Sequence, residues 1–206
     1  MFWLVLDVFL NPDILQNIRM EATACLLSYD SNGNPVFDIE RLNYQPYMQA
    51  SYAETLRLRT HGVILRHNQD DLTFNSWFIP KRSLMAVPSS IAHMNMTVWS
   101  NEERGSKPAS EFWPARFFAP HRKETSSKFC MYNTDGSWIP FGAGIGSCPG
   151  RRFVKREMIT TLATIAIMYD LEVVANEEKL RMSSGRFGFG AVEPGDKISY
   201  CLKIRK

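Results

Sequence analysis

The sequence contains one short segment whose residue types and spacing suit a specific chemistry. Glycine recurs at every second position, at Gly142, Gly144 and Gly146, and Cys148 follows two residues later. Because glycine has no side chain, the backbone of such a loop can lie flat against a broad neighbour. Pro149 suits the first turn of a helix, so the sequence predicts that the thiol of Cys148 lies at a helix N-terminus.

A cysteine at that place is favoured as a thiolate, because the free N–H groups and the dipole of a helix N-terminus stabilise a negative charge. A thiolate on a loop that can approach a flat object meets the requirements of a haem iron with a cysteine axial ligand. The alternative interpretation is a glycine loop closed by a buried, structural cysteine.

This loop resembles the haem-binding signature of the cytochrome P450 family, F-x-x-G-x-x-x-C-x-G, with Phe141, Gly144, Cys148 and Gly150 at the four fixed positions. Glycine averages about 7% of residues, so a chance match of all four positions is rare. The resemblance implies the P450 fold, which is mainly α-helical with small β-sheets. It also implies haem b as the cofactor, Cys148 as the ligand of its iron, and Phe141, Gly142 and Gly144 as residues that lie against the haem.

Two upstream segments strengthen the resemblance. Residues 54–57 (ETLR) match the E-x-x-R helix of the family, and residues 114–117 (PARF) match its P-x-R-F segment. Residues i and i+3 share a helix face, so the Glu54 carboxylate can hold the Arg57 guanidinium. Alone, this pattern also describes an ordinary surface ion pair. The resemblance implies that Arg116 joins the pair in a buried network, which positions the chain and has no catalytic role.

Three single residues are interpreted through the resemblance alone. Arg66 stands where family members bind a haem propionate, and the alternative is a strand arginine that faces solvent. His93 stands where many relatives have a histidine, and we expect a packed core side chain there. Gly146 departs from the family pattern, because many members have Arg or His two residues before the cysteine. One propionate partner is therefore missing.

For a complete relative, the resemblance implies a haem-thiolate monooxygenase that inserts one oxygen atom of dioxygen into a lipophilic small molecule. Its two electrons come from an NADPH-dependent flavoprotein reductase. The segment around Cys148 is similar to that of sterol 7α-hydroxylases, prostacyclin synthase and fungal relatives. A basic run beyond the cysteine is either a docking surface for the reductase or a solvated helix face; it consists of Arg151, Arg152, Lys155 and Arg156.

Two other functions remain open. A haem-thiolate isomerase or dehydratase uses the same loop without dioxygen or a reductase. A non-enzymatic remnant binds no haem, and an exposed apolar face on residues 1–10 would favour that hypothesis.

Residues 1–10 are apolar but too few to span a membrane, which takes about 20 apolar residues, and they are typical of the end of a longer helix. We therefore expect residues 1–206 to be the C-terminal portion of a single P450 domain, with no second domain. A membrane anchor and the oxygen side of the haem would then lie upstream, and the isolated chain would hold haem weakly without turnover. A full-length relative would face the cytosol at the endoplasmic reticulum membrane.

The composition excludes several classes of protein. Of the 206 residues, 45% are hydrophobic and 22% are charged, which is typical of a globular domain and unlike collagen, a coiled coil or a disordered chain. The net charge of +3 is scattered along the chain, so we expect no nucleic-acid partner. The four cysteines form no C-x-x-C pair, which argues against a zinc cluster and a disulfide framework. We expect reduced thiols, most of them buried.

The pattern of apolar residues, proline and glycine also predicts secondary structure. Helices are predicted over residues 12–27, 46–58 and 149–169. Short apolar runs between Val63 and Val87 predict a small strand-rich lobe, and residues 99–140 are expected to be mostly irregular. Alternating polarity predicts a half-buried strand at the C-terminus, over residues 198–204. Residues 187–192 either reach the substrate or form a glycine-rich turn, and the pattern favours the turn.

Overall fold

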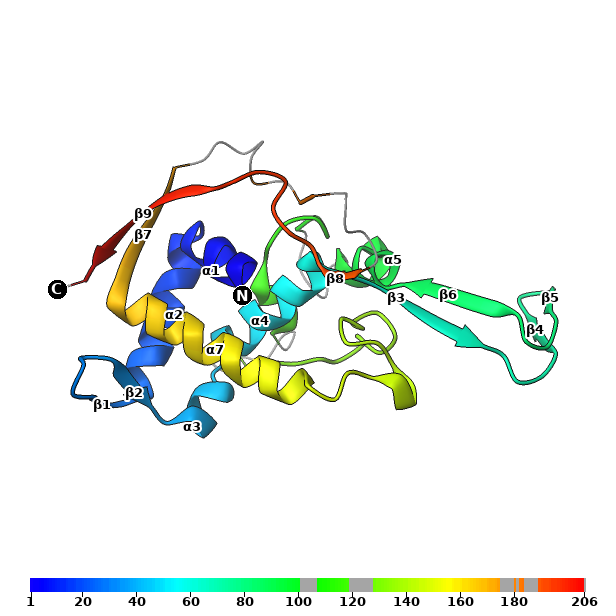
Figure 1. Cartoon of the computed structure of the whole chain (residues 1–206), viewed down its shortest axis with the longest axis horizontal. Coiled ribbons are helices and arrows are strands. Elements are labelled where there is room, and N and C mark those ends of the chain that lie inside the picture. Colours follow the sequence, from blue (N-terminus) through cyan, green and yellow to red (C-terminus); the bar gives the residue numbers. More distant parts are fainter. Residues whose placement is uncertain (101–106, 119–127, 175–179, 181, 184–188, 206) are drawn as a thin grey trace.

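The computed structural model describes residues 1–100, 107–118, 128–174, 180, 182–183 and 189–205. Its helices pack into a body, and a long antiparallel hairpin projects from one end of that body (Figure 1). The expected fold, mainly helical with small β-sheets, is confirmed. Among the described residues, no helix is both long enough and apolar enough to cross a membrane.

The first elements along the chain are α1 (Phe2–Phe9), α2 (Pro12–Ala24), β1 (Leu26–Tyr29), β2 (Pro35–Phe37) and α3 (Ile39–Asn43). Helix α2 begins at Pro12, as predicted. Proline is tolerated there because N–H groups in the first turn of a helix have no partner within the helix. It ends at Ala24, so the prediction that it continues to residue 27 is wrong. The chain turns back at Asp30, whose carboxylate accepts hydrogen bonds from the N–H groups of Asn32 and Asn34, and β1 pairs with β2.

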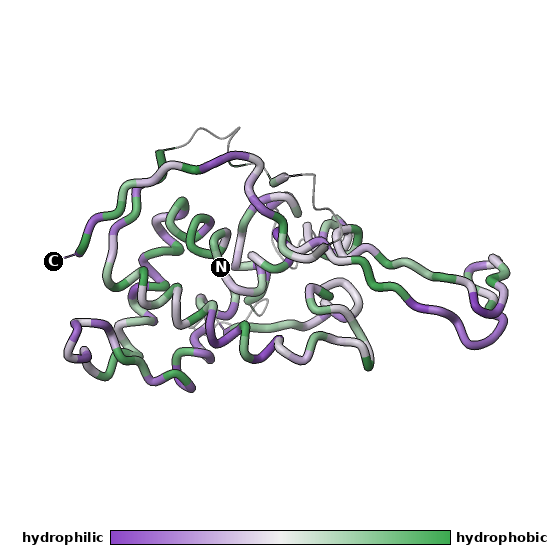
Figure 2. Tube along the Cα trace, viewed as in Figure 1, coloured by the Kyte–Doolittle hydropathy of each residue, from purple (hydrophilic) through white to green (hydrophobic). Residues whose placement is uncertain are grey.

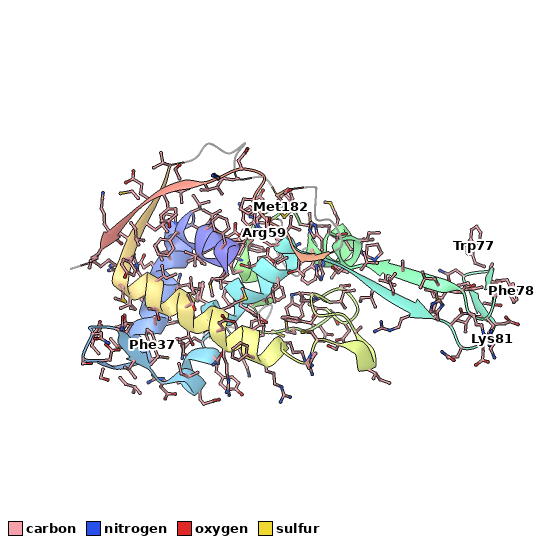
Figure 3. The ribbon with its side chains drawn as sticks, viewed as in Figure 1. Phe37, Arg59, Trp77, Phe78, Lys81 and Met182 are labelled. Atoms are coloured by element: carbon pink, nitrogen blue, oxygen red, sulfur yellow. The ribbon has the colours of Figure 1, made fainter. Side chains whose placement is uncertain are left out.

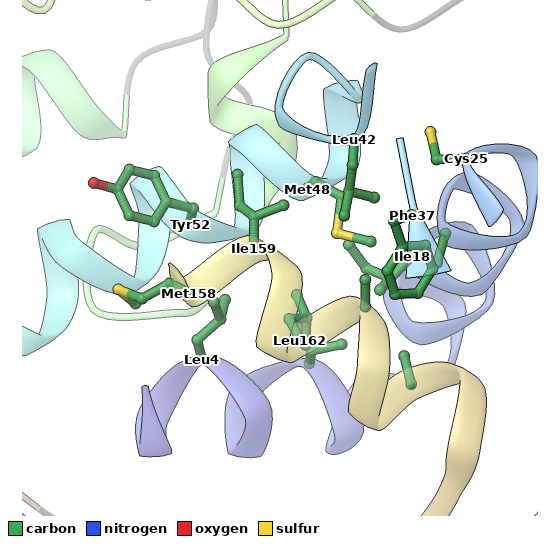
Figure 4. Close-up of a cluster of buried hydrophobic side chains, with 14 of the residues drawn as sticks. Leu4, Ile18, Cys25, Phe37, Leu42, Met48, Tyr52, Met158, Ile159 and Leu162 are labelled. Atoms are coloured by element: carbon green, nitrogen blue, oxygen red, sulfur yellow. The ribbon is translucent and has the colours of Figure 1, made fainter. Parts of the chain in front are cut away.

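Two helices, α4 (Pro46–Arg59) and α7 (Arg151–Met168), form the centre of the body. Residues 48–58 of α4 are all buried, because α1, α2 and α7 pack around this helix. Figure 4 shows the resulting core, in which Leu4 of α1, Met48 of α4 and Ile159 of α7 lie together. Both predicted helices are confirmed, although α7 begins two residues later than expected.

The projecting hairpin, called the finger below (residues 60–88), contains β3 (Thr60–His67), β4 (Leu72–Phe74), β5 (Trp77–Ile79) and β6 (Leu84–Pro88). β3 pairs with β6, and β4 pairs with β5 at the tip. Asn75 and Ser76 adopt the left-handed conformation that a tight two-residue turn requires. Trp77 and Phe78 point outward there (Figure 3). The predicted strand-rich lobe is therefore confirmed.

Two short helices, α5 (Ser89–His93) and α6 (Met96–Trp99), lead from the finger back to the body. They were not predicted, because each is too short to show a helical repeat of apolar residues. The segment that follows contains the one-turn 3-10 helix η2 (Pro114–Phe117). Among its described residues, 107–118 and 128–140, the remainder is mostly irregular, as expected.

The C-terminal strands are β7 (Tyr169–Val174), β8 (Phe189–Ala191) and β9 (Ser199–Ile204). β7 pairs with β9, and β8 joins β3 in a sheet of order β6-β3-β8. The terminal strand shows the predicted alternation (Figure 2), but its predicted half-burial is wrong, because β9 is exposed along its length. Its apolar side faces an open groove shared with α1 and α7. The glycine-rich turn is wrong at residues 189–191, which form β8, while 187–188 lie outside the described residues.

Val192 follows β8 and is hydrogen-bonded to residues of α1 and α4. The indole N–H of Trp3 donates to the Val192 carbonyl, and the Val192 N–H donates to the Arg59 carbonyl over 2.9 Å. The Arg59 guanidinium lies 4.1 Å from the centre of the Trp3 ring, and 2.6 Å separate it from the Asp7 carboxylate. Helices α1 and α4 therefore meet the segment after β8 at one partly buried contact.

Candidate functional site

The three residues predicted to form a buried ion network do so. Glu54 and Arg57 are fully buried on α4, and two hydrogen bonds of 2.7 and 2.9 Å join the guanidinium to both carboxylate oxygens. Arg116 of η2 donates to the same carboxylate over 3.1 Å. The surface-pair alternative is therefore wrong. These three residues are called the buried ion network below.

Arg116 extends this network into the irregular segment. Its guanidinium donates to the backbone carbonyls of Trp99, Lys107, Pro108 and Glu111. Burial lowers the pKa of Arg116, and the charge of Glu54 opposes that shift. A carboxylate and several carbonyls thus surround a buried cation, which is the requirement for tolerating a charge in the interior. Within the described residues, the network thus attaches Trp99 at the end of α6 and residues 107–111 before η2 to the buried carboxylate.

The segment that leads to Cys148 is attached to α4 and α5. Trp138 donates its indole N–H to the Ala53 carbonyl of α4 over 3.0 Å. The Ile139 N–H donates to Nε2 of His93 on α5, also over 3.0 Å. His93 is fully buried, as expected for a core side chain. Neither contact was predicted, because no local pattern connects residues so far apart in the sequence.

Residues 141–150, called the Cys148 loop below, present their backbone to solvent. Gly142 and Gly144 have φ values of +76° and +66°, which strain any other residue. The one-turn 3-10 helix η3 (Gly144–Gly146) follows, with the Ile145 side chain fully exposed. The Cys148 N–H donates to the Phe141 carbonyl over 2.9 Å, which closes the loop.

Cys148 itself is exposed, and all four cysteines are free thiols. Cys25 is buried and Cys130 is half-buried, while Cys201 is exposed like Cys148, so the expectation of mostly buried thiols is wrong. The predicted placement at a helix N-terminus also needs correction. Helix α7 begins at Arg151 after Gly150 as its N-cap, so Cys148 lies two residues before the cap.

Arg66 of β3 lies against the Cys148 loop. Its guanidinium donates to the Ala143 carbonyl over 2.9 Å, although much of the side chain faces solvent. A Cβ atom at Gly146 would lie only 2.8 Å from Nη2 of Arg66. The guanidinium of Arg66 therefore lies directly against Gly146, but it is the far end of a flexible, exposed side chain, so this contact alone does not require glycine at position 146.

A small groove lies beside the start of α7. Its lining includes the aromatic side chains of Tyr52, Trp138 and Phe141 and the basic side chains of Arg151, Arg152 and Lys155. Lys155 donates to the Gln49 side chain over 2.7 Å, and burial lowers its pKa. Of the predicted basic run, Arg156 pairs instead with Glu40 of α3, beyond the groove.

The Cys148 loop fits a haem. Its backbone is exposed and rich in glycine, the thiol is accessible, and the Arg66 cation lies at its edge, where a carboxylate can reach it. In the described part of the chain, no three His, Cys, Asp or Glu side chains form a metal-binding group. An ion bound at Cys148 would need ligands from elsewhere, and a porphyrin supplies four nitrogens.

Comparison with known proteins agrees with this geometry. The family model "Cytochrome P450" matches residues 1–201. The cytochrome P450 monooxygenase calL of Penicillium decumbens is 30% identical over 174 residues, which are 84% of this chain and 31% of that protein. The cytochrome P450 monooxygenase efuG of Hormonema carpetanum is 29% identical over 226 residues, and the match covers 99% of this chain and 40% of that protein.

The 25-hydroxycholesterol 7-alpha-hydroxylase of Rattus norvegicus is 25% identical over 213 residues, which are 100% of this chain and 50% of that protein. The chain thus spans between about a third and a half of the length of these relatives. The match across residues 1–201, together with the buried ion network and the Cys148 loop, shows that this chain belongs to the cytochrome P450 family.

Proposed function

We propose that this chain provides the thiolate side of a haem-thiolate monooxygenase, with Cys148 as the axial ligand of the iron. One observation carries the proposal: the Cys148 backbone is fixed to Phe141 while its thiol stays accessible on a glycine-rich loop. When bound, a thiolate-ligated haem supplies the activation of dioxygen that inserts one oxygen atom into a C–H bond. The proposed substrate is a lipophilic small molecule, in keeping with the sterol hydroxylase among the relatives.

Each residue of the loop has a distinct task in this proposal. Cys148 binds the iron, and the absence of side chains at Gly142 and Gly144 lets the backbone approach the flat macrocycle. Phe141 packs edge-on against Trp138, with 6.4 Å between ring centres, and this contact holds the start of the loop in place. Arg66 pairs with a haem propionate. The buried ion network orients the segments around the loop and takes no part in the chemistry.

The proposed electron donor is an NADPH-dependent flavoprotein reductase. The groove beside α7 supports this assignment, because its basic lining residues Arg151, Arg152 and Lys155 suit an acidic partner, and electron transfer requires docking near the iron ligand. We further propose that the 206 residues belong to one domain. A full-length relative would lie at the cytosolic side of the endoplasmic reticulum membrane.

The ligand assignment is tested by the absorption spectrum of the 206-residue chain, reduced and saturated with carbon monoxide in excess haem. We expect a red-shifted band of the thiolate type, which Cys148→Ala abolishes. Cys201→Ala is the matched control, because Cys201 is also exposed and lies outside the loop. Identical spectra for the wild type and Cys148→Ala would refute the assignment and favour a remnant that binds no haem.

We expect weak haem retention by this chain and no turnover, since Cys148 and Ile145 are open to solvent. Gel filtration after haem loading measures this retention. A stable complex with one haem per chain after filtration would contradict the expectation, without affecting the assignment of Cys148 as the ligand.

A further inference from the structure

His93 contacts both the buried ion network and the segment that leads to Cys148. Its backbone carbonyl accepts a hydrogen bond of 2.7 Å from Nη1 of Arg57. Its side chain accepts the Ile139 N–H at Nε2 over 3.0 Å. The residue is fully buried at the end of α5. One residue therefore joins two parts of the molecule that are 36 and 46 positions away from it in the sequence.

The hydrogen bond from Ile139 determines the form of the imidazole. A backbone N–H always donates, so Nε2 must be an acceptor and must carry no proton. The neutral ring then has its proton on Nδ1. A charged ring would place an N–H at Nε2 directly against the N–H of Ile139, and the contact would be lost.

From Ile139, short backbone contacts lead to the iron ligand. The Ile139 carbonyl accepts the N–H of Gly142 over 3.1 Å, and the Phe141 carbonyl accepts the N–H of Cys148 over 2.9 Å. The position of Ile139 thus sets the position of the first residues of the Cys148 loop. Trp138 makes the neighbouring attachment to α4, but through its side chain.

We propose that His93 is a positioning residue: as a neutral imidazole with a bare Nε2, it holds the Cys148 loop against the buried ion network. The hydrogen bond to Ile139 exists without haem, whereas its value for iron ligation rests on the proposed function. His93 touches neither the iron site nor a substrate, so its role is to place the loop.

The surroundings of His93 favour the neutral ring. Burial is the main cause that lowers the pKa of His93 to about 4; the charges of Arg57 and His61 add to it, and backbone hydrogen bonding by Thr60 and Arg57 opposes it. Arg57 belongs to α4 and is a cation beside His93, whereas burial lowers the pKa of His61 on β3, so His61 is neutral near pH 7. The hydrogen bond to Ile139 is therefore present throughout the neutral pH range.

The test is amide hydrogen exchange at Ile139, followed by nuclear magnetic resonance in the 206-residue chain. In His93→Leu, the Ile139 N–H loses its acceptor, and we expect its exchange to accelerate at least tenfold. In His93→Gln, the side-chain oxygen can take the place of Nε2, and we expect most of the protection to return. His67→Leu is the matched control, because His67 lies exposed on the finger.

The amides of Ile159 and Leu162 in the core of α7 report on the fold, and we expect them to exchange at the wild-type rate in His93→Gln. Unchanged protection of Ile139 in His93→Leu would refute the proposal, and so would an equal loss in His93→Gln and His93→Leu.

A second measurement needs no variant and covers the case in which His93→Leu does not fold. The nitrogen-15 shifts of His93 at pH 7 distinguish a bare Nε2 from a protonated one, and a protonated Nε2 would overturn the proposal. Neither readout requires haem. If haem fails to bind while Ile139 depends on His93, the proposed function fails and the positioning contact stands.

Discussion

The buried ion network and the Cys148 loop are linked through His93 and Ile139 and are opposite in construction. Glu54 and Arg57 are fully buried, and their hydrogen bonds are completed by groups of this chain. Cys148 and Ile145 are exposed on a loop whose backbone takes conformations that glycine alone adopts easily. The buried ion network, called the anchor below, holds segments of the chain together, whereas the Cys148 loop exposes its thiol for a ligand. Damage to the anchor should therefore lower stability, whereas damage to the loop should lower ligand binding.

The largest expected effect is on the anchor. Glu54→Ala leaves Arg57 and Arg116 buried without their counter-charge, so we expect the free energy of unfolding to fall by about 3–5 kcal/mol. Urea denaturation of the 206-residue chain measures this loss. Glu40→Ala is the matched control, since the Glu40–Arg156 pair is exposed and should contribute at most about 1 kcal/mol. Equal losses in the two variants would break the distinction between anchor and surface.

A smaller effect on stability is expected at the N-terminal end of α4, the helix that carries Glu54 and Arg57. The Glu21 carboxylate of α2 accepts the N–H groups of Tyr47 and Met48 in the first turn of α4, over 2.8 and 2.9 Å. Burial raises the pKa of Glu21 to about 7, against the opposing effect of those two hydrogen bonds. The folded state therefore binds a proton more tightly than the unfolded chain, so this contribution to stability is present below about pH 4.5 and is lost as pH rises through 7.

Urea denaturation at pH 5 and at pH 8 tests this linkage. The contribution of Glu21 to the free energy of unfolding is at most about 3 kcal/mol. We expect Glu21→Gln to remove that part of the pH dependence, because glutamine does not titrate. Other groups also titrate in this range, so the result is the difference between the slopes of the wild type and the variant. Equal slopes would show that Glu21 has an ordinary pKa in the folded chain.

The smallest effect on stability is expected in the loop. Gly144→Ala places a side chain at positive φ, which costs about 1 kcal/mol. Gly33→Ala is the matched control, because Gly33 has a similar φ of +79° in the β1–β2 turn and likewise has open space around it. We expect similar unfolding free energies for the two variants, but weaker haem binding in a titration of Gly144→Ala alone. Equal haem affinities would show that the loop conformation does not matter for binding.

Local patterns predicted the parts of the fold that depend on neighbours in the sequence. Proline in the first turn located the starts of α2 and α4, and alternating short apolar runs located the finger. The β1–β2 hairpin was missed because Leu26 and Leu27 continue the apolar run of α2, and only the turn at Asp30 interrupts it. β8 was read as a turn because its strand conformation depends on pairing with β3, over a hundred residues earlier in the chain.

The candidate site divides in the same way. The Glu54–Arg57 pair follows from helix geometry, and the motif that contains Arg116 was recognisable, so the buried ion network was predicted correctly. The attachments of Trp138 to Ala53 and of Ile139 to His93 were not, because they join residues 85 and 46 positions apart. The hydrogen bond from Arg66 to the Ala143 carbonyl likewise joins residues that are 77 positions apart in the sequence. The roles of Cys148 and Arg66 toward haem stay predictions.

The contact around Val192 has a consequence for biosynthesis. Trp3 and its hydrogen-bond partner are separated by 189 residues, so a ribosome that adds about 5–20 residues per second needs roughly 10–40 seconds to complete the pair. During that interval α1 and the end of α4 have no carbonyl or N–H from Val192 to bind. Nascent chains that have not yet reached Val192 should therefore be cut by proteases at α1 faster than the 206-residue chain.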